Sequence, residues 1–201
     1  MTEPMLTLSG GMPDRVFQDF ALLLAPLAAS VANFCDHVEH NEPADRAWVL
    51  DSAEALRAAA LDLARSCDLS LLDLYAERLG EIEARNVLAH PGGFDGHRAV
   101  LDARTWRDLQ LVQVEHDRYY HPDVLGMAKV EQLRHTALHL AKIVGAFAEP
   151  REAGELLQRR LPDVVLFSIK LATVMGCRLP DELAVPSAAD RTAAEAAPAT
   201  A

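Results

Sequence analysis

Hydrophobic residues recur with a helical period along most of this chain. In the first half, apolar side chains return every three to four positions through residues 16–40, 44–67 and 70–88. This spacing predicts three amphipathic helices. Pro26 lies inside the first of them and should kink it, because proline cannot donate the helical hydrogen bond. Ser70 stands where the third helix needs an N-cap.

A fourth helix is predicted over residues 106–120, directly after Thr105. Threonine is a favoured N-cap, so Thr105 should begin this helix. One face of it carries most of its large side chains, namely Trp106, Leu109, Val112, His116 and Tyr120. The pattern therefore directs His116 toward the protein interior.

The last third of the chain predicts two more helical stretches after a turn at residues 121–123. The first runs over residues 129–149 and ends before a proline. The second covers residues 151–176 and should be interrupted near Pro162. Gly176 is placed to cap its C-terminal end, where glycine adopts the left-handed conformation without strain.

These patterns divide the chain into five segments. Residues 1–13 form an N-terminal extension, and residues 14–88 form a helical half. Residues 89–104 contain His-Pro-Gly-Gly and a third glycine, which break the periodicity and predict a connecting loop. Residues 105–184 form a second helical half. From Pro186 onward the chain holds no large apolar side chain, so we expect a disordered tail over residues 185–201.

Composition favours an all-α helical bundle. Half of the residues are hydrophobic but only 5% are aromatic, and alanine and leucine are abundant. Such a composition is typical of helices packed through small and aliphatic side chains. The formal net charge of −11 repels phosphate backbones and anionic lipid surfaces, so we expect neither nucleic acid nor membrane as a partner.

The cysteines and the N-terminal sequence predict a cytoplasmic protein. Cys35, Cys67 and Cys177 are odd in number and widely spaced, which is not the pattern of a disulfide framework or a Cys-x-x-Cys metal site. The first 15 residues lack a basic segment followed by an apolar core, and we find no apolar run that approaches a membrane span.

Residues 140–149 and 159–183 resemble the MazG-like all-α nucleotide pyrophosphohydrolases. The matching positions are the hydrophobic frame together with Gly145, Asp163, Gly176 and Leu179. The resemblance implies a helical bundle and a small-molecule or nucleotide-like ligand. It also implies a Mg²⁺ site built from Glu-x-x-Glu and Glu-x-x-Asp pairs, because hard carboxylate oxygens suit that ion.

The same template fits residues 51–85, which suggests two related halves. In that alignment Leu63 and Ala64 match Leu171 and Ala172, and Leu69 stands where Cys177 stands. Two such halves in one chain would mimic a dimer of the family, and a further homodimer would then be optional. Any two helices rich in alanine and leucine align tolerably, so the repeat depends on weaker signals than the resemblance.

The metal-binding positions depart from the family. The four positions in the second half hold Ile143, Ala146, Arg160 and Asp163, and those in the first half hold Ser30, Asn33, Ser52 and Ala55. Asp163 is the one carboxylate among the first four. This set does not provide the usual Mg²⁺ cluster, so Mg²⁺ is disfavoured and the family activity does not carry over directly.

Histidines offer a different ligand set. His135 and His139 lie one helical turn apart, and they would face Asp163 if the helix packed as in the family, with His116 as a fourth ligand. Two imidazoles and a carboxylate suit Zn, Mn, Fe or Ni. Glu115 would then act as general base on a metal-bound water.

Two functions from different classes follow. The first is a metal-dependent hydrolase of a small phosphorylated or nucleotide-like metabolite. The alternative is a catalytically inactive ligand-binding or protein-interaction module, which the lost carboxylates favour. In that case His135 and His139 would be polar residues satisfied by their neighbours, and Glu115 and Asp117 would be solvated surface residues.

Overall fold

The computed structural model describes residues 14–86 and 93–182. The predicted N-terminal extension and the predicted tail lie outside these ranges. Within them the chain forms helices and no strand, which confirms the all-α class.

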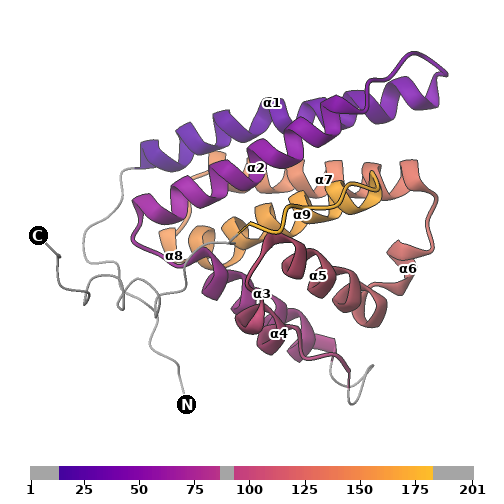
Figure 1. The fold of residues 1–201 in the computed structure, drawn as a ribbon. Coiled ribbons are helices and arrows are strands. Elements are labelled where there is room, and N and C mark those ends of the chain that lie inside the picture. The colour runs from indigo at the N-terminus through magenta and orange to yellow at the C-terminus, as the bar shows by residue number, and fades with distance from the viewer. Residues whose placement is uncertain (1–13, 87–92, 183–201) are drawn as a thin grey trace, which may run out of the picture.

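Four long helices form a bundle. They are α1 (Asp14–Glu39), α2 (Ala47–Ser66), α7 (Lys129–Ala148) and α9 (Leu161–Val174). Going round the bundle, α1 packs on α7, α7 on α9, α9 on α2, and α2 back on α1 (Figure 1). The two predicted halves therefore contribute two helices each and share one hydrophobic core.

A second group of helices covers the side of α9 that the bundle leaves open. It contains α3 (Leu71–Asn86), α4 (Gly96–Asp102), α5 (Trp106–Tyr120) and α6 (Pro122–Leu125). Both α3 and α5 pack against α9, and α4 lies between them (Figure 1). Because it has neighbours on both sides, α9 buries nearly its whole surface, including the polar side chains of Asp163 and Ser168.

Two short helices correct the sequence interpretation. The predicted connecting loop contains α4, whose N-cap Asp95 accepts a hydrogen bond from the backbone N–H of Arg98. The predicted turn at residues 121–123 begins α6, with Pro122 at its first position, where the missing N–H costs nothing. Both helices are too short to show a hydrophobic period.

The interruption predicted near Pro162 lies before the proline. The short helix α8 (Ala153–Glu155) leads into a π-helical segment, η1 (Leu156–Arg160), and α9 follows directly. Pro162 falls in the first turn of α9, where proline is tolerated. In α1 the helix continues through Pro26 from Asp14 to Glu39.

The predicted N-caps are confirmed. Thr105 and Asp108 form a capping box at the start of α5: the Thr105 hydroxyl accepts from the Asp108 N–H, and the Asp108 carboxylate accepts from the Thr105 N–H. At the start of α3 the Ser70 hydroxyl accepts from the Asp73 N–H. These bonds satisfy donors that a helix start leaves unpaired.

The C-terminal ends of α2 and α9 have the same cap geometry. Asp68 and Gly176 both have a positive φ, of 55° and 67°. The N–H of Leu69 donates to the carbonyl of Ala64, and the N–H of Cys177 donates to the carbonyl of Ala172. The pairs Ala64/Ala172 and Leu69/Cys177 are those matched in the sequence alignment of the two halves.

Helix α1 carries large apolar side chains on its exposed face. Leu22 and Leu23 are 71% and 52% exposed, whereas Leu24 is buried. Among the described residues α1 alone is long and apolar enough to span a membrane, with 33% of its most apolar window buried inside the protein. This helix qualifies by length and composition only, and charged residues interrupt it near both ends, so the cytoplasmic location stays a prediction.

Candidate functional site

The carboxylate of Asp163 is paired with two arginines. Its carboxylate accepts hydrogen bonds from Arg78 of α3, with Nε–Oδ1 at 2.6 Å and Nη2–Oδ2 at 3.3 Å, and Nη1 of Arg160 lies 3.8 Å from Oδ2. Burial raises the pKa of Asp163, and the two guanidiniums offset only part of that effect. A carboxylate that faces two cations is a structural partner and not a free metal ligand.

His116 points inward as predicted but faces carboxylates on opposite sides. It is 0% exposed, its Nε2 lies 3.7 Å from Oε1 of Glu83, and its Nδ1 lies 3.9 Å from Oδ1 of Asp117. Neither ring nitrogen makes a hydrogen bond. The backbone of Gly96 lies directly against Glu83 and His116. A Cβ at this position would come within 2.5 Å of Glu83 Oε1 and 3.0 Å of the His116 ring, so residue 96 has no room for a side chain.

His135 and His139 lie together on α7, with ring centroids 4.6 Å apart. His139 also stacks on Phe167 of α9 at 4.7 Å. Over residues 14–86 and 93–182, no group of three or more histidine, cysteine, aspartate or glutamate side chains is placed to hold a metal ion. The predicted ligand set of His116, His135, His139 and Asp163 is therefore not assembled.

The predicted base Glu115 is also engaged elsewhere. Its carboxylate accepts a hydrogen bond from Nη1 of Arg118, one helical turn along α5, at 2.6 Å. This is a partly exposed pair on the outer face of the helix. Asp163 is engaged by an arginine of a neighbouring helix, which the sequence pattern of a single helix does not show, whereas Glu115 is engaged by Arg118 of its own helix.

A buried polar network lies where α3, α5 and α9 meet. The Tyr75 hydroxyl donates to Oε1 of Gln113, and Nε2 of Gln113 donates to Oδ1 of Asp117 at 2.9 Å. The same carboxylate oxygen lies 2.9 Å from Nζ of Lys170. The side chains of Lys170 and Asp117 are only 11% and 8% exposed. We call this ion pair the pocket pair.

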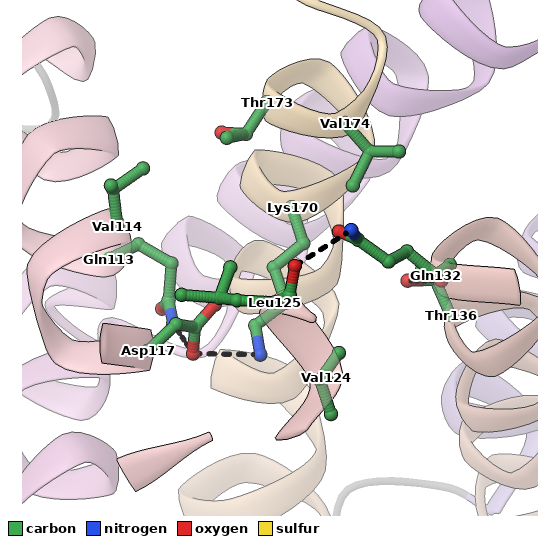
Figure 2. A pocket seen from close by; sticks show the side chains of 10 residues that line it. All are labelled: Gln113, Val114, Asp117, Val124, Leu125, Gln132, Thr136, Lys170, Thr173 and Val174. Atoms are coloured by element: carbon green, nitrogen blue, oxygen red, sulfur yellow. Dashed lines mark hydrogen bonds and ion pairs between the residues drawn. The ribbon is translucent and has the colours of Figure 1, made fainter. Parts of the chain in front are cut away.

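The pocket pair forms one wall of a pocket between α5, α6, α7 and α9 (Figure 2). Figure 2 shows the Asp117–Lys170 pair on one side and Gln132 and Thr136 of α7 on the other. The lining is mostly apolar, and Val114, Val124, Leu125 and Val174 complete it. Its cavity volume is about 30 Å³, which is room for one or two water molecules or for a small polar group.

The charge of Lys170 acts on three imidazoles. Burial lowers the pKa of His121, His135 and His139, and the Lys170 ammonium lowers each of them further. The shift is largest at His139, whose pKa falls to about 4. In Asp117, burial works to raise the pKa, but His116 and Lys170 bring it below its usual value. At neutral pH the three imidazoles are therefore uncharged next to a charged pair.

Sequence analysis missed Asp117 and Gln113 as interior residues. Asp117 was expected at the surface and is 6% exposed, so that expectation is wrong. A signal did exist, because Gln113, His116 and Asp117 share a face with Leu109 at helical spacing, and Lys170 is the one basic residue of α9. The polar stripe on α5 and the lysine on α9 indicate a buried ion pair only once α5 and α9 are known to be neighbours.

Comparison of the chain with family models, with curated proteins and with solved structures finds no match. The resemblance to MazG-like proteins therefore stays a prediction.

Proposed function

We propose that this chain is a helical ligand-binding module whose site is the pocket between α5, α6, α7 and α9. The observation that carries this proposal is the pocket pair, a buried lysine and aspartate that border open space. The ligand is a small molecule with a polar end group. This is the binding alternative of the two functions that the sequence suggests.

The energetic argument starts from the cost of burying charge. Removing a carboxylate and an ammonium from water costs several kcal/mol each, and their attraction does not always repay it. Apolar side chains of similar size would serve the fold at least as well. An ion pair kept beside a cavity therefore favours a role in recognition, where Lys170 and Asp117 offer a donor and an acceptor to an incoming group.

The size of the pocket limits what enters it. Pockets that enclose a whole small organic ligand measure about 300–1,000 Å³. This one encloses about 30 Å³, so it accommodates an end group while the rest of the ligand lies over α6 and α7. The two side chains of α6 in the lining, Val124 and Leu125, would contact that part.

Solution NMR of the full chain tests the proposal. Small amides, carboxylic acids and phosphate monoesters would be added in turn, and we expect shifts at Gln113, Thr136 and Lys170. Val174→Phe narrows the pocket and should abolish them, whereas Val38→Phe makes the same change on α1 and should not. The proposed site would be refuted if the same NMR shifts appeared in Val174→Phe, or if no compound caused shifts in the wild-type protein.

A metal-dependent hydrolase is a second candidate, favoured by the 4.6 Å separation of the His135 and His139 rings. Two imidazoles one turn apart can hold a transition metal when water or substrate supplies the other ligands. Metal analysis of the purified protein tests this candidate. Stoichiometric zinc, manganese, iron or nickel that disappears in His135→Ala/His139→Ala would support it, and a metal-free protein would defeat it.

We also propose that the chain consists of two related, MazG-like halves, one contributing α1 and α2 and the other α7 and α9. The matched caps of α2 and α9 support this, since Asp68 and Gly176 take up the same left-handed conformation at aligned positions. Aspartate is less suited to that conformation than glycine. Asp68→Gly should therefore be tolerated or stabilising, measured by urea unfolding, and a clear loss of stability would contradict equivalence.

A further inference from the structure

Helix α1 has an outer face that the rest of the described chain leaves uncovered. The helix packs on α2 and α7 and lies along one edge of the bundle (Figure 1). Leu22 and Leu23 are 71% and 52% exposed. Pro26, Ala29 and Ala32 extend the same exposed surface toward the C-terminal end of the helix. We call this surface the outer face of α1.

The outer face differs from the solvated face of a neighbouring helix. Residues 20–35 of α1 contain no charged side chain, and they span about four helical turns. Over a similar length α2 exposes Asp51, Glu54, Asp62 and Arg65. A helix that is apolar all round is normally covered on every side. The outer face of α1 is therefore suited to a partner.

A groove of about 410 Å³ runs along this face, between α1 and α2. It is lined by Pro26, Ala29, Ser30, Asn33, His37 and Trp48. Its first four residues follow the spacing i, i+3, i+4 and i+7 along α1. In coiled coils four residues of one helix form the hole that receives a single side chain of the facing helix. The groove is thus shaped to receive a side chain from another helix.

We propose that the outer face of α1 binds the same face of a second copy of the chain, with the two α1 helices antiparallel. This inference is independent of the proposed function, because the residues that line the pocket belong to α5, α6, α7 and α9. It assigns a homodimer to one surface of the molecule.

Charges at the two ends of the outer face determine the orientation. Four exposed residues of α1 follow one another at intervals of seven and form one stripe, namely Arg15, Leu22, Ala29 and Asp36. In an antiparallel pair centred between residues 25 and 26, Arg15 lies opposite the partner's Asp36. Leu22 then lies opposite the partner's Ala29, and the two-fold axis repeats both contacts. A parallel pair would place like charges side by side at both ends.

In this register Leu22 is the side chain that enters the groove. The middle of the four-residue hole lies between Ala29 and Ser30, which is the position that the second copy's Leu22 reaches. Two-fold symmetry fills both grooves at once. Burial of Leu22 supplies most of the attraction. The exposed ion pairs contribute little to affinity and mainly select the antiparallel orientation.

A second copy fits this face better than a lipid bilayer does. The uncharged stretch of residues 20–35 is shorter than the roughly 20 residues that a membrane-spanning helix needs. Entry into a bilayer would also pull Phe20 away from Phe147 of α7, with which it makes an edge-on contact at 4.8 Å. Association through the outer face keeps the bundle intact.

Sedimentation velocity of the full chain over a range of concentrations tests the proposal. One helix from each copy makes a small interface, so we expect a reversible dimer with a dissociation constant of about 10 µM. Leu22→Glu places a charge at the groove and should weaken the dimer at least about tenfold. Leu138→Glu makes the same change at a leucine of α7 that is 67% exposed, and it should leave the dimer unchanged.

An exchange of charges tests the antiparallel register. Arg15→Asp and Asp36→Arg should each weaken the dimer about threefold or more, because like charges then meet across the interface. Arg15→Asp/Asp36→Arg should restore it. Asp36→Arg also reduces the net charge of −11. General repulsion between two copies would therefore make that variant associate more tightly, which is the opposite of the expected result.

Each outcome of these experiments supports or overturns the inference. Support is a dimer that Leu22→Glu weakens, that Leu138→Glu leaves intact and that the double charge exchange restores. A monomer at every concentration, a dimer unaffected by Leu22→Glu, or an exchange that does not restore the dimer would overturn it. Binding of a monomer to phosphatidylcholine vesicles would assign the outer face to lipid and overturn it as well. The NMR shifts that test the pocket do not depend on any of these results.

Discussion

Helix α9 carries two buried ion pairs about two turns apart. Both are short and buried, but their surroundings differ. One is the pocket pair of Lys170 and Asp117, with Nζ–Oδ1 at 2.9 Å. The other joins Asp163 to Arg78, with Oδ1–Nε at 2.6 Å and side chains 8% and 13% exposed. We call this second pair the clamp pair.

The surroundings of the two pairs separate structure from recognition. In the clamp pair a bidentate guanidinium and a second arginine, Arg160, saturate one carboxylate, and Glu81 takes the remaining face of Arg78. In the pocket pair the ammonium borders a cavity and three uncharged imidazoles. A short, buried ion pair is thus weak evidence of function. A cavity beside the pair, where its charged groups can still contact a ligand, is stronger evidence.

The largest effect should come from breaking the clamp pair. Arg78→Met leaves the buried carboxylate of Asp163 with Arg160 as its remaining cation, at 3.8 Å. Leaving a buried charge without its partner costs about 3–5 kcal/mol, and we expect about 3 kcal/mol because Arg160 compensates in part. Urea unfolding measures this. Arg85→Met, which also removes a Glu81 partner but on the exposed surface, should change stability by less than about 0.5 kcal/mol.

The pocket pair should respond differently when both charges are removed. Lys170→Met should cost about 2 kcal/mol, since Asp117 keeps a hydrogen bond from Gln113 but loses its cation. Lys170→Met/Asp117→Asn keeps an acceptor for Gln113 and should recover most of that loss, while ligand binding stays absent. A double variant that is no more stable than Lys170→Met would show that the pair serves the fold as the clamp pair does.

A smaller effect should come from the tyrosine that supports the pocket pair. Tyr75→Phe removes the hydroxyl that donates to Gln113 in a fully buried position. Leaving that acceptor unsatisfied should cost about 1 kcal/mol in urea unfolding. Tyr119→Phe makes the same change on an exposed side chain and should have no measurable effect.

The two pairs also show what sequence can and cannot predict here. The long helices, the Thr105 cap and the inward face of His116 follow from local spacing, and the structure confirms them. The partners of Asp163 and Asp117 depend on which helices become neighbours. Arg78 lies 85 positions from Asp163 along the chain, so no local pattern indicates that contact.

The predicted set of four metal ligands is not brought together, for the same reason. The sequence shows that His135 and His139 share a face of α7, which the structure bears out. It does not show that Asp163 turns toward α3 and its arginine. The short helices α4 and α6 were missed because four to seven residues give too few positions to establish a hydrophobic period.

The sharpest contrast between the two sides of α9 should appear on acidification. Burial lowers the pKa of His139 from its usual value of 6.5 to about 4 in the folded protein. The unfolded chain therefore binds the proton first, and stability contributed by the uncharged imidazole is lost as the pH falls from 6.5 toward 4. Asp163 contributes to the pH dependence of stability with the opposite sign. Because its pKa is raised in the folded protein, the folded state binds a proton before the unfolded chain does, and acidification does not reduce the stability that Asp163 contributes.

Two measurements test this contrast. Free energies of unfolding in urea, taken from about pH 7 to about pH 4, should fall less steeply for His139→Gln than for wild type. Carboxyl NMR titration should place the pKa of Asp163 above the usual aspartate value of 3.8 and the pKa of Asp117 below it. If both carboxyls shifted in the same direction, the two pairs would share one electrostatic environment, and the distinction between clamp and pocket would have no basis in charge.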